Sequence, residues 1–132
     1  MPRQNFRPDW PSARRVRISQ AVRIGDLVYT SGQVAYDRDG NIVGRGDMSA
    51  QSRQVFANIR DVLALAGASM DDVFKITAFI TDMSKYADYS AARSEAFPND
   101  PPASSTVSTP RLVNPELLVE VEAIAYRPTL VS

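Results

Sequence analysis

The chain has 132 residues, and its 15 lysine and arginine residues balance its 15 aspartate and glutamate residues. A single domain of this length can bury about two thirds of the surface of its unfolded chain, so it needs no disulfide or structural metal. The lack of net charge disfavours a nucleic-acid partner. The absence of cysteine and histidine removes thiolate nucleophiles, imidazole bases and the usual zinc ligand sets.

The first fifteen residues are rich in proline and arginine, carry Phe6 and Trp10 as isolated aromatics, and show no periodicity. They predict an N-terminal arm over residues 1–15, followed by one domain over residues 16–132. A solvated tail and an arm that packs Trp10 on a neighbouring subunit are both compatible with this composition. The arm lacks the apolar core of a signal peptide, and no stretch is long enough to span a membrane, so we expect a cytoplasmic protein without membrane contact.

A β-hairpin is expected first, because polar and apolar residues alternate over 16–24 and β-forming residues continue over 27–34. Gly25-Asp26 supplies the turn between them. Apolar residues then recur at three- and four-residue spacing, which predicts a helix capped by Asp47 or Ser49 and ended by Gly67. The remaining elements, in chain order, are a strand over 73–81, a helix over 84–97, and strands over 105–109 and 117–126.

This order, ββαβαββ, predicts an α+β fold in which two helices cover one face of a single mixed sheet. The strands carry apolar residues on both sides, so the second face of the sheet is also expected to be apolar. Such a face needs a covering partner, which favours an oligomer.

Several motifs occur in an order that resembles the Rid (YjgF) family of small enamine and imine deaminases. They lie at residues 19–33, 51–59 and 73–83, in PPASSTV at 101–107, and in LVEVEAIA at 118–125. The resemblance implies the chorismate-mutase-like YjgF fold and a homotrimer with active sites in clefts between subunits. It also implies a small-molecule substrate and a reaction that uses no metal or organic cofactor.

The resemblance assigns roles to individual residues. Glu120 matches the glutamate that positions the attacking water, although an alternating strand would carry such a polar residue in any case. Glu122 lies on the same strand face and could raise the pKa of one of the two carboxyls. Ser31 and Gly32 match the turn that faces the cleft; an ordinary strand-end turn is the alternative.

Three positions depart from the family pattern. Ser104 stands where the family has an arginine that clamps the substrate carboxylate, Ile18 where it often has a tyrosine, and Ser90 where it often has an asparagine. A serine hydroxyl cannot neutralise a carboxylate. Arg93, one helical turn after Ser90, and Arg111, in the loop after the strand bearing Ser104, could each supply a replacement guanidinium, or could be ordinary solvated arginines.

These departures leave three functions open. The first is a divergent Rid-type hydrolase that deaminates a reactive enamine or imine. The second is a non-catalytic small-molecule-binding or interaction protein on the same trimer. The third, the L-PSP endoribonuclease activity formerly attached to the family, is disfavoured by the balanced charge and by the absence of histidine and of a basic aromatic stripe.

Overall fold

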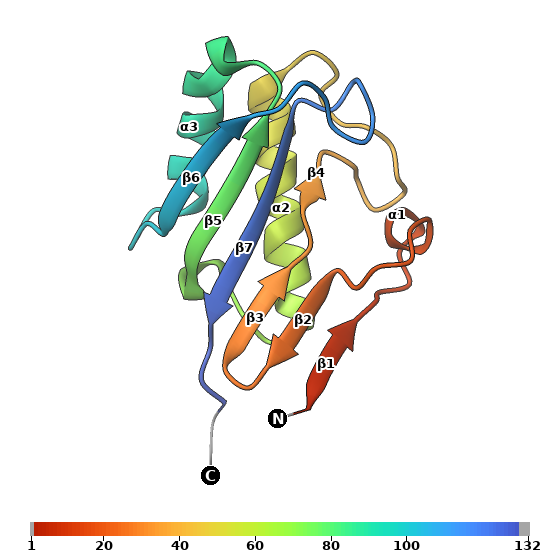
Figure 1. Ribbon diagram of the computed structural model, residues 1–132, viewed down its shortest axis with the longest axis vertical. Coiled ribbons are helices and arrows are strands. Elements are labelled where there is room, and N and C mark those ends of the chain that lie inside the picture. The colour runs from red at the N-terminus through yellow and green to blue at the C-terminus, as the bar shows by residue number, and fades with distance from the viewer. Residues whose placement is uncertain (1, 130–132) are drawn as a thin grey trace.

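The computed structural model describes residues 2–129, which form one sheet with helices on one side (Figure 1). Met1 of the expected arm and residues 130–132 of the expected domain lie outside the described residues. The strands are β1 (Arg3–Phe6), β2 (Ala21–Ile24), β3 (Leu27–Thr30), β4 (Gln33–Val34), β5 (Val73–Ile80), β6 (Ala103–Ser108) and β7 (Val119–Tyr126). The helices are α1 (Pro11–Arg14), α2 (Met48–Leu65) and α3 (Tyr86–Ala96), with 3₁₀ turns at Met70–Asp72 and Met83–Lys85.

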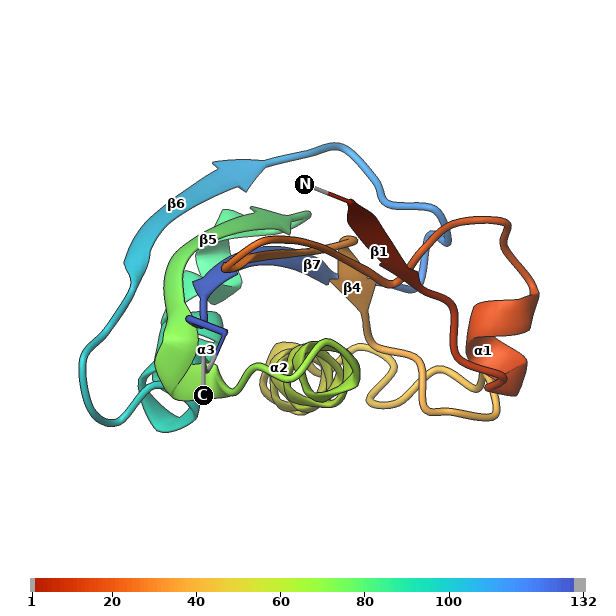
Figure 2. The same cartoon turned by 90° about the horizontal axis from the view of Figure 1, so that it is seen from below.

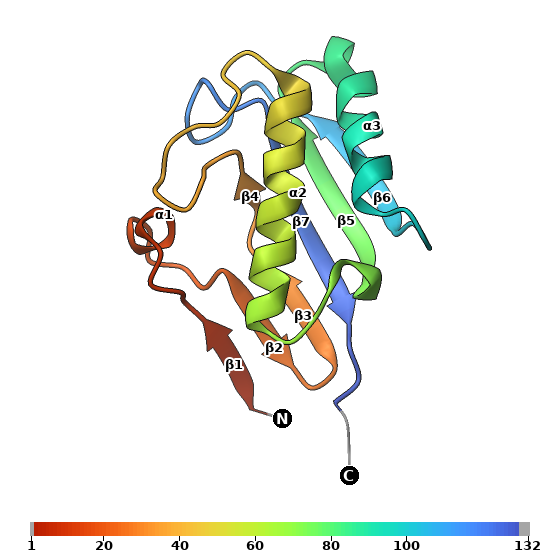
Figure 3. The ribbon, with the colours of Figure 1, turned by 180° about the vertical axis from the view of Figure 1, so that it is seen from behind.

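The sheet has the order β1-β2-β3-β7-β5-β6, and the short strand β4 pairs with the part of β7 that β3 leaves free. Strands β5 and β6 are parallel and the other pairs are antiparallel, so the sheet is mixed. Figure 2 shows the sheet curving over α2, and Figure 3 shows α2 and α3 side by side on the same face. The predicted α+β architecture, with two helices on one face of a single mixed sheet, is confirmed.

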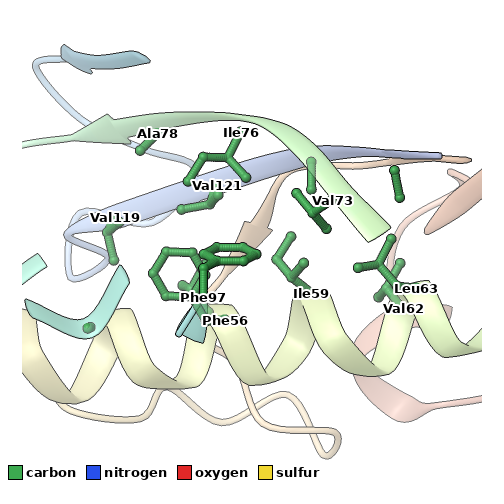
Figure 4. Packing of buried hydrophobic residues seen from close by; sticks show 14 of the residues in the cluster. Phe56, Ile59, Val62, Leu63, Val73, Ile76, Ala78, Phe97, Val119 and Val121 are labelled. Atoms are coloured by element: carbon green, nitrogen blue, oxygen red, sulfur yellow. The ribbon is translucent and has the colours of Figure 1, made fainter. Parts of the chain in front are cut away.

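The long helix α2 begins and ends where the sequence predicts. The Asp47 carboxylate accepts a hydrogen bond from the Ala50 amide at 3.0 Å, which satisfies one of the free N–H groups at the helix start. Gly67 follows the end of the helix with a φ of 81°, a conformation that glycine adopts without steric cost. The helix packs Phe56, Ile59 and Leu63 against the buried faces of β5 and β7 (Figure 4).

Gln51 joins the start of α2 to the chain that leads into β7. Its buried amide nitrogen donates to the carbonyls of Gly44 and Glu116, and its amide oxygen accepts from the Leu118 N–H at 2.8 Å. All three bonds reach backbone groups in otherwise irregular segments. One buried side chain therefore fixes the position at which β7 enters the sheet.

The segment expected as an arm has regular structure. Strand β1 pairs antiparallel with β2, and Trp10 packs against the core with the Arg38 guanidinium 4.3 Å from its ring centre. Of the two alternatives that the composition left open, the solvated tail therefore does not describe residues 3–14, because Phe6 and Trp10 pack against the core. The sequence of β1 shows no alternation of polar and apolar residues, because β1 is a short edge strand whose residues are mostly exposed.

The hairpin in the structure is shorter than the alternation over residues 16–24 predicts. Regular pairing begins only at Ala21, because Val16 and Ile18, each 48% exposed, have no sheet face to cover. The second strand is interrupted between β3 and β4. There the Ser31 amide donates to the Gln20 carbonyl at 2.9 Å and the Ser31 hydroxyl donates to the Ser19 carbonyl at 2.6 Å. These bonds turn the chain at Ser31-Gly32.

The face of the sheet opposite α2 and α3 carries apolar side chains. Val28 is fully buried on the helix side, so its neighbours Leu27 and Tyr29, exposed by 38% and 49%, point to the other side. Tyr29 pairs with Ile124, and Phe79 pairs with Val107 on the same open face. This is the apolar second face that the sequence predicts.

Candidate functional site

Glu120 lies at the centre of the open sheet face, on β7. It pairs with Val34 of β4 on one side and with Phe79 of β5 on the other. Its neighbours Val119 and Val121 are fully buried on the helix side, whereas Glu120 itself is half-buried. The alternation of the strand therefore directs this carboxylate out of the core but not fully into water.

Burial raises the pKa of the Glu120 carboxyl above its ordinary value, and the nearby Glu122 carboxylate adds to the rise. Desolvation disfavours the charged form of any carboxyl, and a second negative charge on the same strand face disfavours it further. A carboxyl of this kind can hold or release a proton closer to neutral pH than an exposed glutamate can.

Gly32 packs directly against Glu120. A Cβ atom at position 32 would lie 2.7 Å from the Glu120 carboxyl carbon and 3.0 Å from one of its oxygens. The glycine at the β3–β4 turn therefore leaves the space that the carboxylate occupies. Because glycine has no Cβ atom, the backbone at position 32 can approach the carboxylate this closely.

Glu120, Gly32 and Ile18 line the same cavity, which has a volume of about 450 Å³. The N-terminal segment forms its other wall with Trp10, Arg15 and Val16. Sequence reasoning missed Arg15, whose guanidinium lies 4.9 Å from the centre of the Tyr36 ring and donates to the Gly40 carbonyl. The only sequence signal for it is a basic residue within the proline- and arginine-rich segment that was expected as an arm.

Ser104 lies in a different part of the molecule. It is in β6, the edge strand, and pairs with the buried Ile76 of β5. Because Ile76 and Phe79 are three residues apart on one strand, their partners Ser104 and Glu120 point to opposite faces of the sheet. A single chain therefore does not bring Ser104 and Glu120 together.

Arg93 and Ser90 of α3 lie beside Ser104. The Arg93 guanidinium donates to Ser104 Oγ at 3.4 Å, to Ser90 Oγ at 3.0 Å and to Tyr86 Oη at 3.1 Å. It also faces the rings of Tyr86 and Tyr89, with its central carbon 5.7 and 5.4 Å from their centres. Of the two arginines singled out from the sequence, Arg93 is the one placed at Ser104.

The contacts described for two other candidates are local. The hydroxyl hydrogen of Ser31 is used by the Ser19 carbonyl at the turn. Arg111 is exposed, and its Nε donates to the carbonyl of the next residue, Leu112. Neither residue lines the cavity that contains Glu120.

Within residues 2–129, no three acidic side chains come together in a way that could hold a metal ion. No helix in this part of the chain is long and apolar enough to cross a membrane.

Comparison with known proteins identifies the family. The family model described as Endoribonuclease L-PSP matches residues 11–127. A RutC family protein of Pyrococcus abyssi is 36% identical over 109 residues, which are 83% of this chain and 85% of that protein. The structure of Rv2704 from Mycobacterium tuberculosis, described as a member of the YjgF/YER057c/UK114 family, matches with 32% identity, a TM-score of 0.82, and coverage of 95% of this chain and 99% of that one.

A second solved structure, RidA from an Antarctic Psychrobacter species, has 33% identity and a TM-score of 0.84, with 93% of this chain and 98% of that one covered. The family-model match alone contains α2, α3, the turn at Gly32 and every strand except β1. The identities and coverage of these relatives are high enough to establish kinship and not only a shared fold. The chain therefore belongs to the Rid/YjgF family, whose fold it has.

Proposed function

We propose that this protein is a divergent Rid-type hydrolase that converts a reactive enamine or imine to a carbonyl compound and ammonia. The observation that carries the proposal is the Glu120 carboxyl, which is half-buried beside Gly32 at the wall of a cavity, with its pKa raised by burial. Membership of the Rid/YjgF family is consistent with a protein that processes or binds a small molecule.

The proposed reaction needs proton transfers and one water molecule. An enamine first takes a proton at its terminal carbon and becomes an imine. Water then adds to the imine carbon, giving a carbinolamine. The C–N bond breaks as the nitrogen leaves with an added proton as ammonia, and the hydroxyl loses its proton to give the carbonyl. Glu120 would accept a proton from the water and return it to the departing nitrogen.

The complete site is proposed to form between two copies of the chain. The Glu120 group and the Ser104 group lie on opposite faces of one sheet, so one copy would supply Glu120, Gly32 and Ile18 and a second would supply Ser104, Ser90 and Arg93. The exposed edge of β6 and the open apolar face support such an arrangement. A homotrimer is the assembly that the family resemblance predicts.

The test is hydrolysis of imines generated in solution by an amino-acid oxidase, with the carbonyl product followed by a coupled dehydrogenase. The wild type should release product faster than the spontaneous reaction, and Glu120→Gln should lose the enhancement while keeping its fold. Glu122→Gln is the matched control, because Glu122 is exposed on the same strand and should retain most of the rate. Equal rates for wild type and Glu120→Gln would contradict the proposal.

A binding protein without catalysis is the second candidate, favoured by the changes at Ile18, Ser90 and Ser104. It predicts saturable binding of a small ligand with no acceleration of imine hydrolysis. A structured RNA, included because the matching family model carries an endoribonuclease description, should remain uncleaved. The same set of assays therefore separates the three functions.

A further inference from the structure

The cluster around Arg93 is rich in hydrogen-bond donors. A guanidinium has five N–H donors, and the three bonds to Ser104, Ser90 and Tyr86 leave two of them. Each of these three hydroxyls accepts from Arg93, and the Ser90 and Ser104 hydroxyls also lie within hydrogen-bonding reach of the Tyr86 and Tyr89 hydroxyls. Two guanidinium N–H donors and three hydroxyl groups therefore lie in one small region.

This region has no negative charge of its own. Among the described residues, the ion pairs are formed by other arginines, and no carboxylate oxygen lies within 4.0 Å of the Arg93 guanidinium. A half-buried cation whose neighbours are all neutral hydroxyls is only partly compensated for its lost hydration. An anion accepting several of the free donors would complete the cluster.

The cluster is also held in place and reachable. The Tyr86 and Tyr89 rings support the guanidinium, and Tyr89 itself is fully buried against Phe56. Ser104, in contrast, is exposed at the sheet edge. A ligand can approach from the side of β6 without displacing the aromatic support.

We propose that Arg93, with Ser90 and Ser104, binds the carboxylate of a 2-imino acid substrate, so that the cationic group of the site comes from helix α3 and not from strand β6. This inference rests on the proposed function, because it makes the cluster the part of the cleft that holds the acidic group. Carboxylate is the ligand that a guanidinium fork and neighbouring hydroxyls match best.

The small size of residues 90 and 104 fits this role. An arginine at position 104 would place a second guanidinium next to that of Arg93, and the two positive charges would repel each other. Serine at both positions leaves room for the Arg93 side chain and adds a hydroxyl at each. The residues that depart from the family pattern are therefore mutually compatible in this structure.

The test measures binding and not turnover. The probes are 2-oxobutyrate, which carries the carboxylate and carbonyl of a product, and its uncharged methyl ester, each titrated calorimetrically. The wild type should bind the acid and discriminate against the ester. Arg93→Met should weaken binding of the acid by about 10- to 100-fold and leave the ester unchanged, and Arg93→Lys, which keeps the charge without the fork, should fall between them.

Three controls make the result decisive. Arg53→Met, an exposed arginine of α2, should bind the acid as the wild type does. Glu120→Gln should keep acid binding even though it loses hydrolysis, so a failure of catalysis is distinguished from a failure of the anion site. Light scattering on Arg93→Met should give the wild-type mass.

Several results would overturn the inference. These are the absence of acid binding by the wild type, unchanged acid binding in Arg93→Met, or a loss of binding confined to Arg15→Met or Arg111→Met. A smaller mass for Arg93→Met would also do so, because the guanidinium would then pair with an acidic group of a second copy.

Discussion

The Cα atom of Gly32 lies so close to Glu120 that a methyl group at position 32 would meet the Glu120 carboxyl carbon at 2.7 Å. The glycine is not needed for backbone reasons, since Gly32 is not among the glycines with positive φ. It is needed for space. This contact links the turn between β3 and β4 to the side chain that we propose positions the water.

Replacing Gly32 by alanine should therefore impair catalysis more than folding. The methyl group displaces the flexible end of the Glu120 side chain, and a misplaced catalytic group typically costs about 10- to 100-fold in rate. Steady-state kinetics should show the loss in kcat, with little change in the melting temperature. Gly46→Ala is the opposite control: it meets no atom within 4 Å but has a φ of 73°, so it should lower stability by about 1 kcal/mol and preserve the rate.

Glu120→Gln should stabilise the protein at pH values above the ordinary pKa of glutamate. The pKa of Glu120 is raised in the folded state, so the folded protein holds this proton more tightly than the unfolded chain does. Its contribution to stability is fully present below the unfolded pKa and is lost as pH rises through the folded pKa. Thermal melts should show a higher melting temperature for the variant than for the wild type at pH 7, and the difference should vanish below the ordinary pKa of glutamate, at about pH 4. A difference independent of pH would contradict the assignment.

Gln51→Ala should strongly lower the stability of the protein, because Gln51 is a fully buried polar residue. It removes the described partners of the Glu116 carbonyl and of the Leu118 amide, and one of the two partners of the Gly44 carbonyl, which also accepts from the Asp47 amide at 2.9 Å. Each of the two backbone groups left unpaired costs roughly 1 to 3 kcal/mol, so we expect a loss of about 2 kcal/mol or more in urea unfolding. A loss below about 1 kcal/mol would mean that water replaces the amide.

The protein should be a trimer, with a mass of about three times 14.5 kDa by light scattering. Tyr29→Asp places a charge on the open face of the sheet and should produce a folded monomer, because Tyr29 is 49% exposed in the single chain. Ala64→Asp, on the exposed side of α2, should remain trimeric. A wild-type monomer at micromolar concentration would contradict both the trimer and the intersubunit site.

Moving the guanidinium from position 93 on α3 to position 104 on β6 tests whether an arginine at either position can bind the carboxylate. Ser104→Arg alone places two guanidinium groups together and should bind 2-oxobutyrate no better than the wild type. Ser104→Arg combined with Arg93→Met carries one guanidinium from β6 and should bind the acid at least about tenfold more tightly than Arg93→Met alone. Calorimetry on the two variants measures the difference.

The sequence alone determined the order of the longer helices and strands after residue 16 and the faces that they bury. Regular apolar spacing from Val55 to Leu63 and the alternation of Val119, Val121 and Ala123 are local patterns, imposed because each element must bury one side. The motifs that resemble the family added the role proposed for Glu120 and the departure at Ser104. These inferences needed no knowledge of which strands are neighbours.

Only the tertiary structure decided which of these residues meet. Pairing across β7, β5 and β6 places Ser104 and Glu120 on opposite faces, a consequence of register that spacing along the chain cannot reveal. The contact between Arg93 and Ser104 likewise depends on how α3 packs beside the edge strand. Strand β1 is ordered by its pairing with Ala21–Ile24, and Trp10 packs against Arg38. Long-range packing selects these contacts, because local propensity at short, exposed segments is too weak to do so.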